Sequence, residues 1–208
     1  MTNAIHSPVA NAGARTSSTL LDHIIPDRTF ADQISVSIRA APEAIFQAFS
    51  EVTLDKMPLA SFLGKVRYLP ARLLGKQPPA PSESSFVQGV RAGGWVTLAE
   101  SAGREIVYGG IGKYHQIVDQ EPLALRDRAE FFAFVLPDYQ KLAISVRVEP
   151  GTAGDYRFIM EHRTLPLSEA AKRKFRAYWL VIKPMGAFVS RQLLIAVKRR
   201  AEAAAAQA

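Results

Sequence analysis

Apolar and polar residues alternate along several stretches of the chain, which is the period expected of β-strands with one buried face. The first stretch is residues 33–38, where Ile34, Val36 and Ile38 share a side. Five more stretches follow, separated by short connections rich in Gly and Pro, and they predict an antiparallel meander. They cover residues 94–100, 105–116, 126–135, 140–148 and 156–164. In the last two, one face is expected to be apolar and the other mostly solvated.

Helical spacing of apolar residues marks three other segments. In residues 42–49, a Pro suits the first helical turn and large apolar residues recur three and four apart. Residues 54–76 are apolar but interrupted by two prolines, which predicts a broken helix. A long helix is predicted after Ser168, whose side chain can cap its start. Lys183-Pro184 predicts a kink in this helix or its division into two pieces.

Composition indicates one globular domain. The chain has 208 residues, of which 48% are hydrophobic and 22% charged, and at this size one core is sufficient. Residues 1–27 hold few large apolar groups, so we expect a flexible N-terminal tail there and a single domain over residues 28–208. No apolar run approaches the roughly 18–20 residues that span a bilayer, and cysteine is absent. We therefore expect a cytoplasmic protein.

The order of these predicted elements resembles the helix-grip domains of the SRPBCC superfamily, which includes START-like lipid carriers, plant-allergen-like proteins, polyketide cyclases and aromatic-ring hydroxylase subunits. Residues 35–46 resemble the usual first strand and first helix, and residues 164–200 resemble the end of uncharacterised bacterial members. The resemblance implies an α+β helix-grip fold, in which a curved antiparallel β-sheet wraps around the long C-terminal helix. Two short helical segments follow the first strand, and a cavity lies between sheet and helix.

The predicted ligand-binding residues come from the C-terminal helix and from the apolar strand faces. The resemblance places the helical residues along the cavity, although an aromatic stripe at helical spacing is equally typical of a plain core. Tyr178 and Trp179 combine a large apolar body with a hydrogen-bonding tip, which suits a mostly apolar ligand. The predicted set is Phe175, Tyr178, Trp179, Ile182, Tyr156, Phe158, Met160, His162, Ile144 and Val146.

Catalytic candidates are few, and they are His162, His115 and Tyr114. A buried His beside a Tyr can donate a hydrogen bond to a ligand carbonyl or act as a general base near neutral pH. Such a His is more often a structural group. Metal binding is not expected, because the four histidines show no close ligand spacing and no cysteine is present. The glycines of residues 109–112 lie within a β pattern and not in a phosphate loop, and no cofactor is expected.

The positive charge gathers at the C-terminal end of the chain. Residues 168–208 hold nine Lys or Arg and two Glu, so their net charge of +7 equals that of the whole chain. Such a helix suits contact with an anionic membrane. Nucleic acid is not expected as a partner, because no aromatic residues are interleaved on the cationic face for base stacking.

Three functions remain open at this stage. The leading hypothesis is binding or transport of a small hydrophobic ligand in the internal cavity, without catalysis. The first alternative is a polyketide cyclase/dehydratase-like enzyme that acts on an aromatic or polyketide substrate through His162 or His115. The second is a membrane-surface protein that docks through its basic C-terminal helix.

Overall fold

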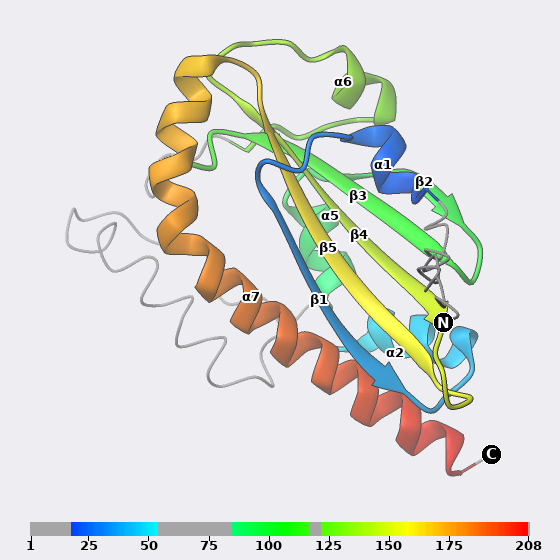
Figure 1. Ribbon diagram of the computed structural model, residues 1–208. Helices are drawn as coiled ribbons and strands as arrows, with labels where there is room; N and C mark the ends of the chain where they lie inside the picture. Colours follow the sequence, from blue (N-terminus) through cyan, green and yellow to red (C-terminus); the bar gives the residue numbers. More distant parts are fainter. Residues whose placement is uncertain (1–17, 54–84, 117–121, 208) are drawn as a thin grey trace, which may run out of the picture.

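A five-stranded antiparallel sheet packs against one long C-terminal helix in the computed structural model, which describes residues 18–53, 85–116 and 122–207. The strand order is β1-β5-β4-β3-β2, so the first and fifth strands are neighbours (Figure 1). The elements are α1 (Leu20–Ile24), β1 (Ala31–Ile38), α2 (Pro42–Glu51), α5 (Phe86–Ala92), β2 (Val96–Ser101), β3 (Glu105–Gly112), α6 (Arg128–Ala133), β4 (Gln140–Pro150), β5 (Tyr156–Pro166) and α7 (Glu169–Ala205). The predicted α+β class and antiparallel sheet are confirmed. The predicted broken helix of residues 54–76 lies outside the described residues.

The inner face of the sheet forms the main core with α2 and α7. Alternate residues of β4 and β5, including Val146, Phe158 and Met160, are buried against the C-terminal half of α7. Helix α2 begins at Pro42 as its sequence predicts, and it packs Ile45 into the same core. The period of two in the strands and the helical spacing in α7 therefore meet in one apolar layer.

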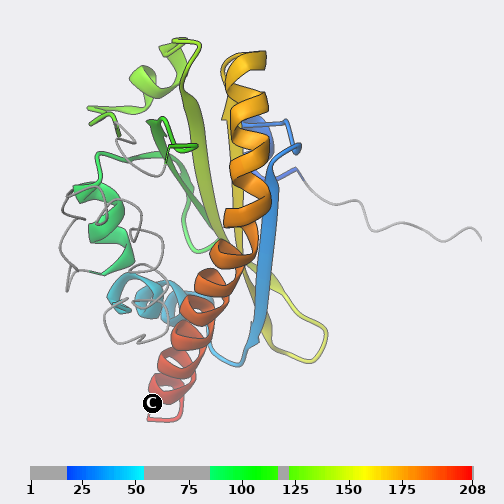
Figure 2. The ribbon, with the colours of Figure 1, turned by 90° about the vertical axis from the view of Figure 1, so that its left-hand side faces the viewer.

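Helix α7 runs without interruption from Glu169 to Ala205, although Pro184 lies inside it. Ser168 caps its start as predicted, accepting a hydrogen bond from the Ala171 backbone N–H at 3.1 Å. Figures 1 and 2 show the helix axis changing direction about half-way along, as the removal of a backbone donor by proline favours.

The sequence predicts no apolar run near the roughly 18–20 residues that span a bilayer, and α7 comes closer to this than expected. By length and composition the helix is apolar enough to cross a membrane, with an 18-residue window of mean hydropathy 1.5. Only 22% of that window is buried. The helix therefore carries more apolar surface than packing against the sheet accounts for.

The outer face of the sheet is also covered, which corrects the prediction that it is mostly solvated. Helices α1 and α6 pack on β2, β3 and β4 and bury Leu21, Leu98 and Phe131 in a second core. The polar residues on this face are buried with them: Glu105, Lys141, Ser145, Arg147, Glu161 and Arg163. Because α1 and its capping residue Thr19 are part of this layer, residues 18–27 are not a tail. Residues 1–17 lie outside the described part.

The predicted strand over residues 126–135 is wrong. Asp127 accepts a hydrogen bond from the Glu130 backbone N–H at 3.0 Å and caps the short helix α6. The strand predicted over residues 105–116 is shorter than expected, because β3 ends at Gly112 and Tyr114 and His115 lie in the turn that follows. The sheet therefore has five strands in the described residues and not six.

Candidate functional site

A pocket of about 320 Å³ lies between the inner face of the sheet and the N-terminal half of α7. Most of its wall is aromatic or aliphatic, and Lys183 and Gly186 are exposed at its rim. The volume is at the lower end of the range of roughly 300–1,000 Å³ found for ligand pockets, which favours a small ligand. The lining residues are Asp32, Trp95, Tyr114, Leu142, His162, Thr164, Phe175, Tyr178, Trp179, Ile182, Lys183 and Gly186.

Trp95 forms part of the pocket wall because Gly110 leaves room for its ring. A Cβ atom on Gly110 would lie 2.4 Å from the nearest atom of the Trp95 indole, closer than atoms can approach. The ring of Tyr114 lies 6.3 Å from that of Trp95, centroid to centroid. The glycine in β3 is therefore explained by close packing of an aromatic side chain, the kind of approach that the β pattern predicted.

The pocket wall holds a buried polar group, the hydroxyl of Tyr114. Its hydroxyl is buried and has no hydrogen-bond partner among the described residues. Burial in apolar surroundings raises the pKa of this hydroxyl well above its usual value, so it stays protonated. A buried, unpaired hydroxyl costs roughly 1–3 kcal/mol. Because Tyr114 lines the pocket, a ligand with an oxygen or nitrogen atom can recover this cost by accepting or donating a hydrogen bond there.

Tyr114→Phe is expected to raise the free energy of unfolding by about 1 kcal/mol, because the variant removes a buried polar group that lacks a partner. Urea denaturation measures this difference. Tyr108→Phe is the matched control. Among the described residues, the Tyr108 hydroxyl is not one of the buried polar groups that lack a partner. Its stability is expected to stay the same or to fall. A loss of stability in Tyr114→Phe would show that the hydroxyl is paired in solution.

His162 on β5 and Asp32 on β1 lie side by side in the pocket, because they are register partners across the two strands. Burial lowers the pKa of His162 to about 4, while the negative charges of Asp32 and Glu161 act in the opposite direction. The imidazole is therefore neutral at pH 7, with one nitrogen that donates and one that accepts. Among the described residues, no group hydrogen-bonds the His162 ring. Neither nitrogen has a partner in the described part of the protein, so either can serve a ligand in the pocket.

The structure brings together half of the residues predicted to bind a ligand. Phe175, Tyr178, Trp179, Ile182 and His162 line the pocket. The other five, Ile144, Val146, Phe158, Met160 and Tyr156, pack in or against the main core below it. Core and pocket are thus stacked along the same strands. The binding role itself stays a prediction.

The three catalytic candidates separate in the same way. Tyr114 and His162 share the pocket, whereas His115 does not line it. The His115 Nδ1 atom lies 3.2 Å from the Gln140 side-chain oxygen, a hydrogen bond that ties the turn after β3 to β4. His115 therefore has a structural role. Among the described residues, no group of His, Asp and Glu side chains could hold a metal ion.

Sequence reasoning missed Asp32, Trp95, Leu142, Thr164, Lys183 and Gly186 as pocket residues. Asp32 lies two residues before Ile34 and so belongs to the apolar side of β1. Thr164 follows His162 by two residues on the same side of β5. Extending each strand alternation by one step would have found both. The position of Trp95, just before β2, has no such signal.

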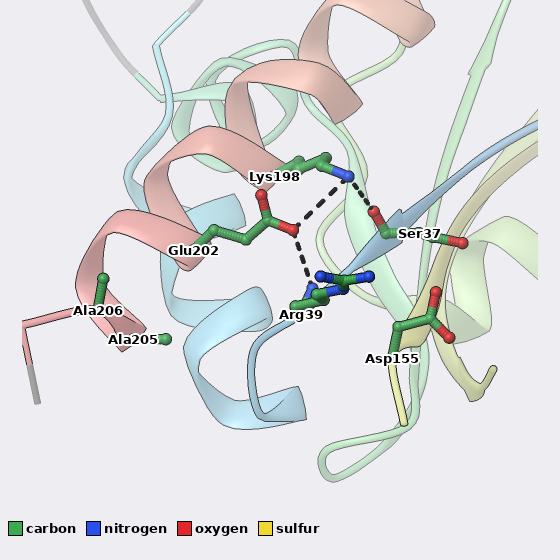
Figure 3. Close-up of a pocket in the computed structure, with 7 residues that line it drawn as sticks. All are labelled: Ser37, Arg39, Asp155, Lys198, Glu202, Ala205 and Ala206. Atoms are coloured by element: carbon green, nitrogen blue, oxygen red, sulfur yellow. Dashed lines mark hydrogen bonds and ion pairs between the residues drawn. The ribbon is translucent and has the colours of Figure 1, made fainter. Parts of the chain in front are cut away.

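A second depression, of about 590 Å³, lies where the end of β1 meets the end of α7 (Figure 3). Two contacts join polar groups across it: Lys198 donates to the Ser37 carbonyl at 2.7 Å, and Glu202 accepts from the Arg39 backbone N–H at 3.0 Å. These contacts fasten the helix to the strand. Most residues that line the depression are polar or charged, so it suits an apolar ligand less well than the pocket beside Tyr114.

No family model, curated protein or solved structure matches the chain.

Proposed function

We propose that the protein binds a small, largely apolar molecule with one hydrogen-bonding group in the pocket between the sheet and α7. The observation that carries the proposal is the unpaired Tyr114 hydroxyl in a wall that is otherwise mostly apolar. Apolar surface supplies the affinity, and one buried polar group fixes the orientation of the ligand. His162 and Thr164 add hydrogen-bonding capacity on the strand side.

The arrangement of sheet and α7 is consistent with the helix-grip fold, and we infer that the chain is a member of the SRPBCC superfamily on the resemblance of residues 35–46 and 164–200. A cavity between sheet and C-terminal helix is what this resemblance implies, and the pocket lies in that place. A cytoplasmic location and the absence of a nucleic-acid partner stay predictions from composition.

Catalysis is the second candidate function, and the pairing of Asp32 with His162 favours it. A carboxylate beside an imidazole, with the Tyr114 hydroxyl in the same pocket, is a set of groups that can move a proton. However, an imidazole with a pKa of about 4 is a weak base at neutral pH. Binding without chemistry is therefore the function that the pocket supports better.

Gly186→Phe tests the proposal by filling the pocket. Gly186 lines the pocket, and a Cβ atom added there meets no atom within 4 Å, so a side chain can begin at this position without a clash. The substitution does not lower the helix propensity of α7, because every residue except proline favours a helix more than glycine does. We expect the affinity for the fluorescent probe N-phenyl-1-naphthylamine to fall at least about tenfold, the loss that corresponds to 1.4 kcal/mol. Fluorescence titration measures it.

Ala177→Phe is the control, since Ala177 is exposed on the same helix and does not line the pocket. Its affinity for the probe should equal that of the unchanged protein. Native mass spectrometry of the purified protein would detect a molecule that co-purifies with it. If the probe binds Gly186→Phe as tightly as the unchanged protein, or binds neither, the pocket is not a binding site for apolar molecules.

A further inference from the structure

Helix α7 has a second apolar side that faces away from the sheet. Leu180 and Val181 are 74% and 68% exposed, and Ala177 and Pro184 beside them are exposed as well. At 3.6 residues per turn, Leu180 lies on the side opposite Phe175, which is buried against the sheet. This part of the helix therefore has apolar residues both toward the sheet and away from it, a pattern typical of helices that meet an apolar environment on more than one side.

Arginines stand at both ends of this second side. Arg173, Ala177, Leu180, Pro184 and Arg191 follow one another at spacings of four, three, four and seven residues, which places them in one line along the helix. We call this line, together with Val181 and Arg176, the outer stripe. From Arg173 to Arg191 it extends about 27 Å, at 1.5 Å per residue.

Within the part of the chain that the structure describes, no carboxylate neutralises the arginines of the outer stripe. Among the described residues, Arg173, Arg176 and Arg191 have no carboxylate partner. Lys174, in contrast, lies 3.4 Å from Asp138. The stripe thus combines exposed aliphatic side chains, which gain from leaving water, with cations that can pair with an anionic partner.

We propose that the outer stripe docks flat on an anionic phospholipid membrane. Leu180 and Val181 insert at the boundary between headgroups and acyl chains, and the arginines at the two ends pair with lipid phosphates and carboxylates. The helix lies on the membrane and does not span it, because Leu193, Leu194 and Val197 in its C-terminal half are buried in the main core. This docking does not depend on what the pocket binds.

The same features disfavour the other occupants. A second copy of the chain would bring two rows of unpaired arginines together, and like charges repel. A nucleic acid would neutralise the arginines but would leave Leu180 and Val181 without an apolar partner. An anionic lipid surface satisfies the charges and the apolar side chains at once.

Docking would place the pocket near the lipid. Lys183 lines the pocket and is exposed, and it follows Leu180 by three residues, so the two side chains are neighbours on the helix surface. The pocket rim and the outer stripe therefore adjoin along α7.

The test compares two double variants that each replace two exposed apolar residues with glutamate. Leu180→Glu with Val181→Glu changes the outer stripe, whereas Val135→Glu with Leu136→Glu changes residues 75% and 54% exposed between α6 and β4. Both pairs are exposed, so both variants are expected to fold, and circular dichroism checks this. Sedimentation is measured with phosphatidylcholine vesicles that contain or lack phosphatidylserine, across a salt series.

We expect the unchanged protein to bind the vesicles that contain phosphatidylserine and to lose binding as salt rises. The outer-stripe variant should bind them at least about tenfold more weakly, and the control variant should bind as before. Changing Arg173 and Arg191 to Gln should weaken binding by about fivefold per arginine. Equal binding by the two double variants, or no vesicle binding by the unchanged protein, would overturn the proposal. So would a dimer of the unchanged protein that the outer-stripe variant converts to a monomer without any vesicle binding.

Probe binding in solution separates this result from the proposed function. The outer-stripe variant should bind N-phenyl-1-naphthylamine as the unchanged protein does, because Leu180 and Val181 do not line the pocket. A variant that loses vesicle binding and keeps probe binding supports docking whatever the outcome for Gly186→Phe. A variant that loses both has disturbed the pocket, and this contradicts the independence of the two sites.

Discussion

Replacing Arg163 with methionine is expected to lower the free energy of unfolding by roughly 3–5 kcal/mol, the cost of removing one partner from a buried ion pair. The Arg163 side chain is fully buried on the outer face of the sheet. Its guanidinium donates to Glu161 at 2.8 Å, to the Ile25 carbonyl at 2.7 Å and to Asp22 at 2.8 Å. Methionine fills similar space but leaves a buried carboxylate short of a donor and a buried carbonyl without one. Urea denaturation measures the loss.

Arg157→Met is the matched control, because Arg157 lies on the same strand and the same face. Its side chain is 47% exposed, and its distance of 3.9 Å to the Glu149 carboxylate is that of a loose surface ion pair. The expected loss is below about 1 kcal/mol. Similar losses for the two variants would mean that burial of the Arg163 network contributes nothing special to stability.

Acid is expected to destabilise the protein through His162, at pH values where most carboxylates are still ionised. The pKa of His162 is about 4 in the folded protein and about 6.5 when the chain is unfolded, so between these values the unfolded chain holds the extra proton. The free energy of unfolding should therefore be constant above pH 6.5 and fall as the pH is lowered from 6.5 to 4. The slope is at most about 1.4 kcal/mol per pH unit, and the total is roughly 3 kcal/mol.

His162→Gln should abolish this dependence, because glutamine does not titrate. Asp32 and Glu161 oppose the lowered pKa of His162, and the cation of Lys183 lies in the same pocket. Asp22 does not interfere. Although partial burial acts to raise its pKa, hydrogen bonds from Thr19 and Arg163 hold it well below its usual value, so its contribution is lost at lower pH. Urea titrations at pH 7, 6 and 5 provide the test, and equal slopes for both proteins would contradict the assignment.

Elements that bury one continuous stripe were predicted well from the sequence. The alternation in β4 and β5 and the helical spacing in α7 each place apolar residues on the side that faces the core. Local capping signals also held, as at Ser168 and at Pro42. These features depend on neighbours along the chain, which is what periodicity measures.

The outer face of the sheet could not be predicted in this way. Lys141, Arg147 and Arg163 look like residues of a solvated face, and their burial depends on partners far away in the sequence. Asp22 is 141 residues from Arg163, and Gln33 is 114 residues from Arg147. The same limit applies to the strand predicted over residues 126–135, where the Asp127 cap and the packing of Phe131 favour a helix.

The pocket was predicted as a place but only partly as a set of residues. The helix contributes the aromatic residues that its spacing indicated. Most of the strand residues that were predicted lie further along their strands, in the main core and not in the pocket. Asp32 and His162 meet only because β1 pairs with β5 in one register. The register between two distant strands decides which of their residues lie opposite each other. The sequence of one strand alone does not determine this register.

That pairing also sets the order in which the protein can assemble. Short turns join β2 to β3 and β4 to β5, so each of these pairs can form soon after its second strand leaves the ribosome. Strand β1 is made early, yet its partner β5 begins only at Tyr156 and the helix that covers both begins at Glu169. Closing so long a loop is slow, because its entropy cost comes before any contact is gained. The apolar side of β1 therefore stays uncovered during synthesis until β5 and α7 have been made.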